Sequence, residues 1–340
     1  MKKFPDREWY DVRSLMGNDW AIFYFLLGGR EVGKSYAITN MFVNQWKRYK
    51  RPFYWMRLTE TSAKKLLCNN AEKLIDPDLR RKYDLDLKVK GENVYDHGQL
   101  MCRVLAVSTY YNDKGQGYFD KDFLNDPNMY YNICLDEMNK EKGEKRQTGG
   151  DIVYSFTNQL ENLVRSTKKR LRVICIGNTL EEASDILCAF NFLPEDFGRY
   201  YLRKKRAVID YMPLNDKYVI RRTGTVADLL MPEASTFTNK IIVDTTLVWK
   251  GRLHKPTAII KFGKEESKWF TLWDDRVISE YNKETVPVLA MRPYLNELFV
   301  QAARDNIIAR FDARWLYYKN LISMKKFQKE LELLKPRANG

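Results

Sequence analysis

An apolar run, a glycine-rich octapeptide and an amphipathic segment follow one another near the start of the chain, and their order constrains the fold more than any other feature. The run over residues 20–27, WAIFYFLL, is typical of a strand buried on both faces of a parallel sheet. The octapeptide over residues 28–35, GGREVGKS, fits the pattern G-x-x-x-x-G-K-[ST]. From Ser35 onward, apolar side chains recur at helical spacing. This strand–loop–helix order predicts a phosphate-binding loop within an α/β domain.

The octapeptide also predicts how the loop would bind ATP. Its glycines let the backbone curl so that N–H groups face a phosphate, and the positive end of the following helix favours the anion. We expect Lys34 to reach the β- and γ-phosphates and Ser35 to coordinate Mg²⁺. The remaining loop residues that would bind the nucleotide are Gly28, Gly29, Arg30 and Gly33. The alternative is a plain glycine turn followed by a solvated lysine.

Two adjacent carboxylates end a second apolar strand, predicted over residues 129–135. Asp136 is placed to hold Mg²⁺, directly or through water, and Glu137 to orient and deprotonate the attacking water. The pair favours an ATPase with a catalytic glutamate over a small GTPase or a nucleotide kinase. An acidic pair at a strand end can also consist of two ordinary loop residues without a catalytic role. The predicted phosphate loop earlier in the chain weakens that interpretation.

Two further residues are candidates for sensing or catalysis. Asn178 follows the apolar strand predicted over residues 171–177, where a polar group can sense the γ-phosphate or simply end the strand. Arg165 flanks the apolar face of a helix predicted over about 152–167. It is a candidate arginine finger toward a neighbouring subunit, and the alternative is an i,i+4 ion pair with Glu161.

Loop lysines are the candidates for DNA contact in this part of the chain. Lys114 lies in a polar loop over residues 111–127, and Lys140 and Lys142 follow the acidic pair. Loops at the carboxyl ends of parallel strands often carry function, so these side chains could grip a phosphate backbone. Solvated surface lysines are the alternative.

The chain divides by pattern and by charge. Strands alternate with helices through residues 1–198, a basic linker is predicted over 199–230, and 231–340 reads as a mainly antiparallel meander with a helical tail over about 295–334. Residues 199–340 hold 27 of the 58 Lys and Arg but only 16 of the 44 Asp and Glu. This excess predicts a polyanionic partner for the second part of the chain.

Composition argues against several other classes of protein. The five cysteines include no CxxC pair and the two histidines are far apart, which disfavours zinc sites and indicates a reducing compartment. Neither a signal peptide nor an apolar stretch long enough to span a membrane is expected.

A two-metal nuclease needs several converging carboxylates. Asp244, Asp274 and Asp275 lie near predicted strands but form no convincing set of three or four.

Five segments together resemble one family, the DNA-packaging ATPases of small Picovirinae-type tailed phages. They are GGREVGKSYA, FYWMR, KGENVYDHGQL, NICLDEM and RLRVICIGN, in this order within about residues 20–180. The resemblance implies an ASCE-type P-loop ATPase domain with a mainly parallel sheet, followed by a smaller RNase H-like α+β domain, a vestigial nuclease that has lost cleavage activity.

The resemblance also implies a function and partners. Such proteins form a homo-oligomeric, pentameric ring that drives double-stranded DNA through a portal into a procapsid. The ring works in the host cell cytoplasm, transiently at the portal vertex, and in some members a phage-encoded structural RNA joins it to the portal.

The resemblance further assigns roles to residues of this chain. Lys34 and Ser35 would bind Mg-ATP, Asp136 would hold the metal and Glu137 would be the catalytic base. Arg57, at the end of the strand FYWMR, would lie near the nucleotide. The sensor would be Asn178, the trans-acting finger Arg165, and the basic pore-loop residues Lys114, Lys140 and Lys142. Two alternatives stay open from the residues alone: an active terminase that also cuts DNA, and a non-enzymatic nucleic-acid-binding adaptor with a fossil phosphate loop.

Overall fold

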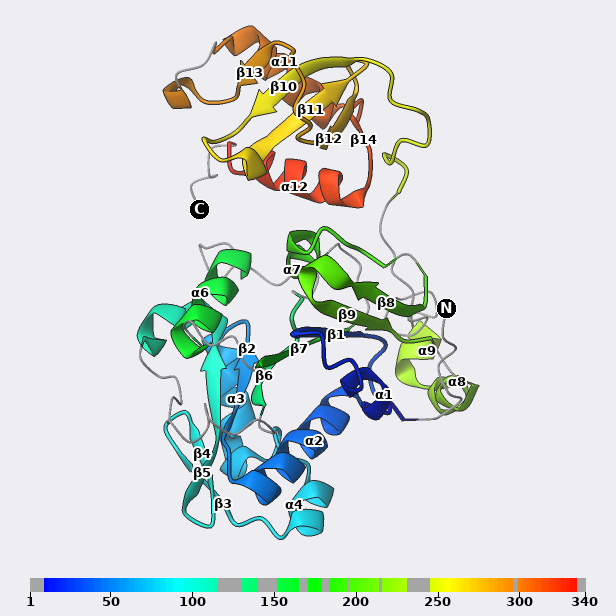
Figure 1. Cartoon of the computed structure of the whole chain (residues 1–340). Helices are drawn as coiled ribbons and strands as arrows, with labels where there is room; N and C mark the ends of the chain where they lie inside the picture. The colour runs from blue at the N-terminus through cyan, green and yellow to red at the C-terminus, as the bar shows by residue number, and fades with distance from the viewer. Residues whose placement is uncertain are drawn as a thin grey trace. The chain divides into compact units, whose positions relative to one another are not determined.

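The computed structural model describes residues 9–114, 130–139, 152–164, 171–178, 184–194, 196–213, 216–230, 245–295 and 299–334. The chain forms two compact units (Figure 1), of which the larger comprises Met1–Phe190 and Pro194–Ile242 and the smaller Asn191–Leu193 and Val243–Gly340. In the described part of the chain, none of the helices has the length and apolar character that a membrane span requires.

A nine-stranded sheet organises the larger unit, in the order β3-β4-β5-β2-β6-β7-β1-β9-β8. The six strands from β5 to β9 in this order are mutually parallel, whereas β3, β4 and β8 join antiparallel at the two edges. The strands are β1 (Phe23–Leu27), β2 (Phe53–Arg57), β3 (Leu87–Lys90), β4 (Asn93–Asp96), β5 (Gln99–Ala106), β6 (Tyr131–Asp136), β7 (Leu171–Gly177), β8 (Gly198–Leu202) and β9 (Ala207–Tyr211). The predicted strands 20–27, 129–135 and 171–177 and the strand FYWMR are thereby confirmed within a few residues.

Helices connect the parallel strands, as a parallel sheet requires. Those in the connections are α2 (Lys34–Tyr49), α3 (Glu60–Ala71), α4 (Pro77–Tyr83), α6 (Ile152–Val164) and α7 (Asp185–Ala189), with the 3₁₀ turn η1 (Val107–Asp113). Helix α1 (Arg13–Met16) precedes β1, the 3₁₀ turn η2 (Arg203–Lys205) joins β8 to β9, and α8 (Asp216–Arg222) and α9 (Val226–Leu230) follow β9. Because the parallel strands run in one direction, the segments that follow them meet at a single edge of the sheet.

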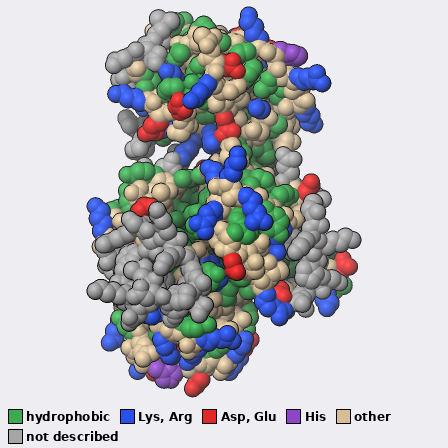
Figure 2. All heavy atoms as spheres, in the orientation of Figure 1, with side chains coloured by type: hydrophobic (Ala, Val, Ile, Leu, Met, Phe, Trp, Pro, Cys, Tyr) green, Lys and Arg blue, Asp and Glu red, His purple; other side chains and the backbone are tan. Residues whose placement is uncertain are grey.

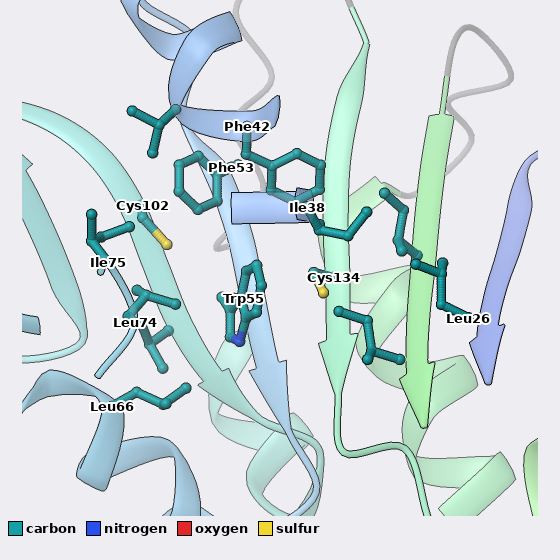
Figure 3. Packing of buried hydrophobic residues seen from close by; sticks show 14 of the residues in the cluster. Leu26, Ile38, Phe42, Phe53, Trp55, Leu66, Leu74, Ile75, Cys102 and Cys134 are labelled. Atoms are coloured by element: carbon teal, nitrogen blue, oxygen red, sulfur yellow. The ribbon is translucent and has the colours of Figure 1, made fainter. Parts of the chain in front are cut away.

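The apolar face of α2 anchors the phosphate-loop helix to the sheet. Phe42 packs against Phe53 and Trp55 of β2, with ring centroids 5.2 Å and 6.3 Å apart. Figure 3 shows Ile38 and Phe42 of α2 beside the side chains of the central strands. Each fully buried side chain of this size contributes about 2–3 kcal/mol through the hydrophobic effect. Packing of α2 therefore fixes where its first turn, and the loop before it, meet the sheet.

Strand β1 is buried on both faces, which explains its uninterrupted apolar sequence. Tyr24 and Leu26 belong to the core that includes α2. Phe23 and Phe25 alternate with them, and both make edge-on contacts with Phe190 after α7, at centroid distances of 4.9 Å and 5.0 Å. The run WAIFYFLL is thus a central parallel strand, as its composition predicts.

The range 199–230, predicted as a basic linker, instead contains β8, β9, α8 and α9, which corrects that prediction. All five residues of β9 are buried, and the basic residues Arg203–Lys205 form the turn that joins the two strands. Arg203 stacks on the Trp20 ring at 4.0 Å, and the carbonyl of Arg206 accepts hydrogen bonds from the start of β1. Four basic residues, Arg203–Arg206, are exposed in this turn, and their charge masked the buried strand β9.

A buried ion pair holds this hairpin to the N-terminal segment. Arg199 Nε and Nη2 donate to the two carboxylate oxygens of Asp210 at 2.5 Å and 2.7 Å, and the Tyr10 hydroxyl donates to Asp210 Oδ2 at 2.9 Å. Asp210 has no exposed surface. Arg199 also donates to the carbonyl of Ser14. One carboxylate therefore connects β8, β9 and the residues that precede β1.

The smaller unit contains a five-stranded mixed sheet in the order β13-β10-β11-β12-β14. Its elements are β10 (Pro256–Lys261), η3 (Glu266–Lys268), β11 (Trp269–Trp273), β12 (Val277–Glu280), β13 (Val288–Ala290), η4 (Pro293–Leu295), α11 (Gln301–Asp312), β14 (Tyr317–Tyr318) and α12 (Leu321–Glu332). The pairings β10·β11 and β11·β12 are antiparallel, but β13 and β14 pair in parallel, so the expected meander is only partly antiparallel. The predicted helical tail is divided by β14.

We predict that Arg199→Met lowers the free energy of unfolding by about 3 kcal/mol, since it leaves the charge of Asp210 buried without its main partner. Urea denaturation followed by circular dichroism measures this loss. The control is Arg13→Met, which removes the surface pair between Arg13 and Asp11, where the arginine side chain is 78% exposed, and should leave the midpoint nearly unchanged. Equal midpoints for the two variants would contradict the prediction.

Candidate nucleotide-binding site

The loop between β1 and α2 is shaped by two glycines. Gly33 precedes the helix with a φ of +84°, a left-handed conformation that favours glycine. A Cβ atom at Gly28 would lie 3.3 Å from the Cβ atom of Met212, just after β9. These two positions explain why the loop needs glycine both where it leaves the strand and where it enters the helix.

Lys34 lies inside the curve of this loop. Its Nζ donates to the carbonyl oxygens of Gly28 at 2.9 Å and Gly29 at 2.5 Å, and only 6% of the residue is exposed. Burial lowers the pKa of Lys34 to about 8, against the opposing effect of Asp136. The loop's own carbonyl oxygens therefore hold the ammonium group inside the curve of the loop.

Ser35 and Asp136 meet across the sheet. The Ser35 Oγ donates to Asp136 Oδ1 at 3.2 Å, although β7 separates β1 from β6. Asp136 is 5% exposed, and burial raises its pKa, against the lowering effects of Arg57 and Ser35. A hydroxyl and a carboxylate at this separation fit the few protein ligands that Mg²⁺ takes beside phosphates and water.

Arg57 bridges both acidic residues from the end of β2. Its Nη2 donates to Asp136 Oδ2 at 2.9 Å, and its Nη1 forms an ion pair with Glu137. Burial alone would lower the pKa of Arg57, but the two carboxylates raise it overall. Glu137 has a φ of +57° and a side chain that is 53% exposed. Its carboxylate thus faces solvent beside the Ser35–Asp136 pair, oriented by a guanidinium.

Asn178 follows β7, the strand between the phosphate loop and Asp136. Its carbonyl accepts a hydrogen bond from Asn139 Nδ2 at 3.4 Å. The preceding Gly177 leaves no space for a side chain, because a Cβ there would lie 2.7 Å from the same Asn139 Nδ2. Close packing therefore joins the ends of β6 and β7 and puts Asn178 at the edge that carries the other candidate residues.

Residues outside the motif also contact the phosphate loop, and sequence reasoning missed them. The Tyr10 N–H donates to the Val32 carbonyl at 3.0 Å. From α8, Arg221 Nη2 donates to the Glu31 carbonyl at 2.7 Å and Arg222 Nη1 to Glu31 Oε1 at 3.2 Å. The apolar strand pattern AVIDYM was the available signal that residues 199–230 belong to this domain.

Lys114 is exposed and follows η1, beyond the end of β5. It therefore lies at the carboxyl edge of the sheet, as predicted. Arg165, Lys140 and Lys142 lie outside the described residues, so their predicted roles stay predictions. Arg30 is exposed at the surface of the phosphate loop.

The base of the Lys114 loop is joined to α6 by buried polar contacts. Gln159 Nε2 donates to Asp113 Oδ2 at 2.8 Å, and Asn162 Nδ2 donates to the Tyr110 carbonyl at 2.7 Å. Burial raises the pKa of Asp113 to about 6, although the hydrogen bond from Gln159 lowers it. The segment before Lys114 is thus packed against α6.

Of the suspected nuclease carboxylates, Asp274 and Asp275 lie among the described residues. Asp274 lies in the turn between β11 and β12, and its carboxylate accepts hydrogen bonds from the backbone N–H groups of His254 at 3.2 Å and Lys255 at 3.1 Å. These bonds lower the pKa of Asp274. Asp244 lies outside the described residues. No group of three or more His, Cys, Asp or Glu suited to a metal occurs among the residues that the structure describes.

The chain matches one family model and several curated proteins. The family model of the podovirus DNA encapsidation protein (Gp16) matches residues 6–304. The DNA packaging protein of Bacillus phage phi29 is 24% identical over 191 residues, 56% of this chain and 52% of that protein. The DNA packaging protein of Bacillus phage B103 is 21% identical over 210 residues, 62% of this chain and 60% of that protein. The matched region thus spans little more than half the length of these curated relatives.

Two solved structures share the fold of the chain. A chain of the bacteriophage phi-29 viral genome packaging motor assembly superposes with a TM-score of 0.69 at 19% identity, over 97% of this chain and all of that chain. A chain of the Phi-28 gp11 DNA packaging motor gives a TM-score of 0.67 at 14% identity, over 98% of this chain and all of that chain. The likeness therefore extends through both units.

We predict that Asp113→Asn stabilises the protein by roughly 1–2 kcal/mol at pH 8 and has little effect at pH 4. Burial holds the folded-state pKa of Asp113 near 6, above its usual value of 3.8. The wild-type protein therefore loses folding stability as the pH rises through 6, because the buried carboxyl must then ionise. Asparagine still accepts from Gln159 and cannot ionise. Melting temperatures across pH 4–8 measure the effect, and parallel wild-type and variant profiles would contradict it.

Proposed function

This chain belongs to the podovirus DNA encapsidation protein family, and we propose that it is an ATP-driven motor that translocates double-stranded viral DNA through a portal into a procapsid. The observation that carries the proposal is the convergence of Lys34, Ser35, Arg57, Asp136 and Glu137 at one edge of the sheet. Phosphate binding, metal binding and activation of water each have a side chain there.

In the proposed mechanism, Lys34 and the loop N–H groups bind the β- and γ-phosphates. Ser35 and Asp136 would hold Mg²⁺, which neutralises developing charge on the phosphates when bound. Glu137 orients the attacking water and takes its proton, and its exposed carboxylate has access to that water. Arg57 positions both carboxylates, and Glu137 acts as a base once its carboxylate turns from the guanidinium to the water. Asn178 senses the γ-phosphate.

Strand order supports an ASCE-type assignment for the larger unit. One strand, β7, lies between the phosphate-loop strand β1 and the strand β6 that ends at Asp136. The smaller unit, with its antiparallel β10–β12 and a fourth strand parallel to β10, supports an RNase H-like domain. We propose that this domain is a nuclease-inactive one.

DNA contact is assigned to the loop lysines Lys114, Lys140 and Lys142. On the face that Figure 2 shows, Lys and Arg side chains are interspersed with Asp and Glu. The further partners of the proposal are the portal protein, a phage-encoded structural RNA and other copies of the chain in a pentameric ring. The ring would act in the host cytoplasm at the portal vertex.

We predict that Glu137→Gln abolishes DNA-stimulated ATP hydrolysis, with a loss of at least about 100-fold, and leaves ATP binding within a few-fold of wild type. Glutamine keeps the shape of the side chain but cannot take the proton. The matched control is Glu60→Gln on the surface of α3, which should hydrolyse ATP normally. Turnover by Glu137→Gln would remove the assigned base.

DNA-stimulated ATP hydrolysis and plasmid cleavage together distinguish the alternative functions. An adaptor with a fossil phosphate loop would bind DNA without hydrolysing ATP. An active terminase would cut plasmid DNA in the presence of Mn²⁺, whereas the proposed motor leaves the plasmid intact.

Mixing two inactive variants tests whether Arg165 acts across subunits. Arg165→Ala should lose roughly 1,000-fold in hydrolysis, as arginine-finger variants do. Mixed one to one with Glu137→Gln, it should regain about a quarter of the wild-type rate if sites act independently, because some intact sites then face intact fingers. No recovery in rings that demonstrably contain both variants would contradict a finger in trans.

A further inference from the structure

The N-terminal segment lies against the phosphate loop. Tyr10 donates its backbone N–H to Val32, and the ring of Trp9 lies beside Gly33, where a Cβ atom would come within 3.2 Å of its Cε3 atom. The Trp9 side chain is nevertheless largely open to solvent, with the residue 53% exposed. A large aromatic ring is thus held at the loop without being buried there.

Helix α8 brings a cation to the same ring. The guanidinium carbon of Arg221 lies 4.4 Å from the ring centroid of Trp9 and 5.7 Å from that of Tyr218. Arg221 is also tied to the loop itself through the Glu31 carbonyl, and its neighbour Arg222 binds the Glu31 carboxylate. Two segments more than 200 residues apart in the chain therefore place an indole and a guanidinium side by side at the phosphate loop.

The Trp9 indole and the Arg221 guanidinium both have flat, polarisable faces, which favour a planar ligand. Indole rings stack on nucleic acid bases without regard to base sequence, and guanidinium planes stack on the same surfaces. A nucleotide whose phosphates lie on the loop must put its base within the length of one ribose from it. The Trp9–Arg221 pair, in contact with Gly33 and Glu31, lies within that reach.

We propose that Trp9 and Arg221 form the subsite that binds the purine base of the nucleotide. This inference rests on the proposed ATPase function and extends it to residues outside the motif. The base stacks on the exposed surface that the Trp9 ring and the Arg221 guanidinium form together, so the nucleotide joins the N-terminal segment, the phosphate loop and α8. The basic residues of α8 thereby belong to the nucleotide site rather than to a nucleic-acid docking surface.

The test compares ligands with and without a base. Affinities for ATP and for inorganic tripolyphosphate are measured by calorimetry on wild type, Trp9→Ala and Trp9→Phe. Trp9→Ala should weaken ATP binding roughly tenfold, the size of one lost stacking contact, and leave tripolyphosphate binding within about twofold. Trp9→Phe should retain most of the ATP affinity. Equal losses for both ligands would mean that Trp9 only supports the loop, and unchanged ATP affinity would also overturn the proposal.

Arg221→Ala provides an independent second variant in case Trp9→Ala does not fold. It should weaken ATP more than tripolyphosphate, by several-fold. Its matched control is Arg203→Ala, because Arg203 stacks on Trp20 at 4.0 Å in the same unit but beside the start of β1. That control should bind both ligands like wild type. A wild-type protein that binds neither ligand would contradict the proposed function, whereas one that binds both equally well would contradict the base subsite alone.

Discussion

The buried carboxylate of Asp136 is the interaction on which the candidate site depends. It accepts hydrogen bonds from Ser35, in the first turn of α2, and from Arg57, at the end of β2. A carboxylate removed from water needs such partners, because desolvation of an unpaired charge costs several kcal/mol. The parallel sheet supplies them by bringing the carboxyl ends of its strands to one edge. Ser35, Arg57, Asp136 and Glu137 are therefore positioned by one connected set of bonds.

Residues outside the octapeptide also support the phosphate loop. The buried Asp210 ties the hairpin β8–β9 to Tyr10, and Tyr10 in turn binds the loop at Val32. Met212, just beyond β9, fills the space beside Gly28. The loop is thus supported by the chain before β1 as well as by the chain after β9. Residues after 198 thus belong to the larger unit, although their charge suggested a linker.

Much of the fold could be predicted because burial leaves a local pattern. The apolar runs of β1, β2, β6 and β7 mark strands covered on both faces, and they were located within a few residues. The hairpin β8–β9 was missed, since three basic residues in its turn dominate the composition of that stretch. In the smaller unit, the parallel pairing of β13 and β14 left no local signal, because a pairing direction depends on the path of the chain between strands. The family, predicted from five motifs, is confirmed.

The amino-acid sequence by itself determined the glycine-rich octapeptide and the acidic pair, because each consists of neighbouring residues. It also determined the family, because five short segments occur in a characteristic order. Only the tertiary structure decided which groups meet. Ser35 and Asp136 are 101 residues apart in the chain, and Glu31 and Arg222 are 191 apart. Such contacts follow from the order of strands in the sheet and from which helix ends reach its edge. No spacing along the chain encodes them, since they arise when the packed core brings distant strand ends together.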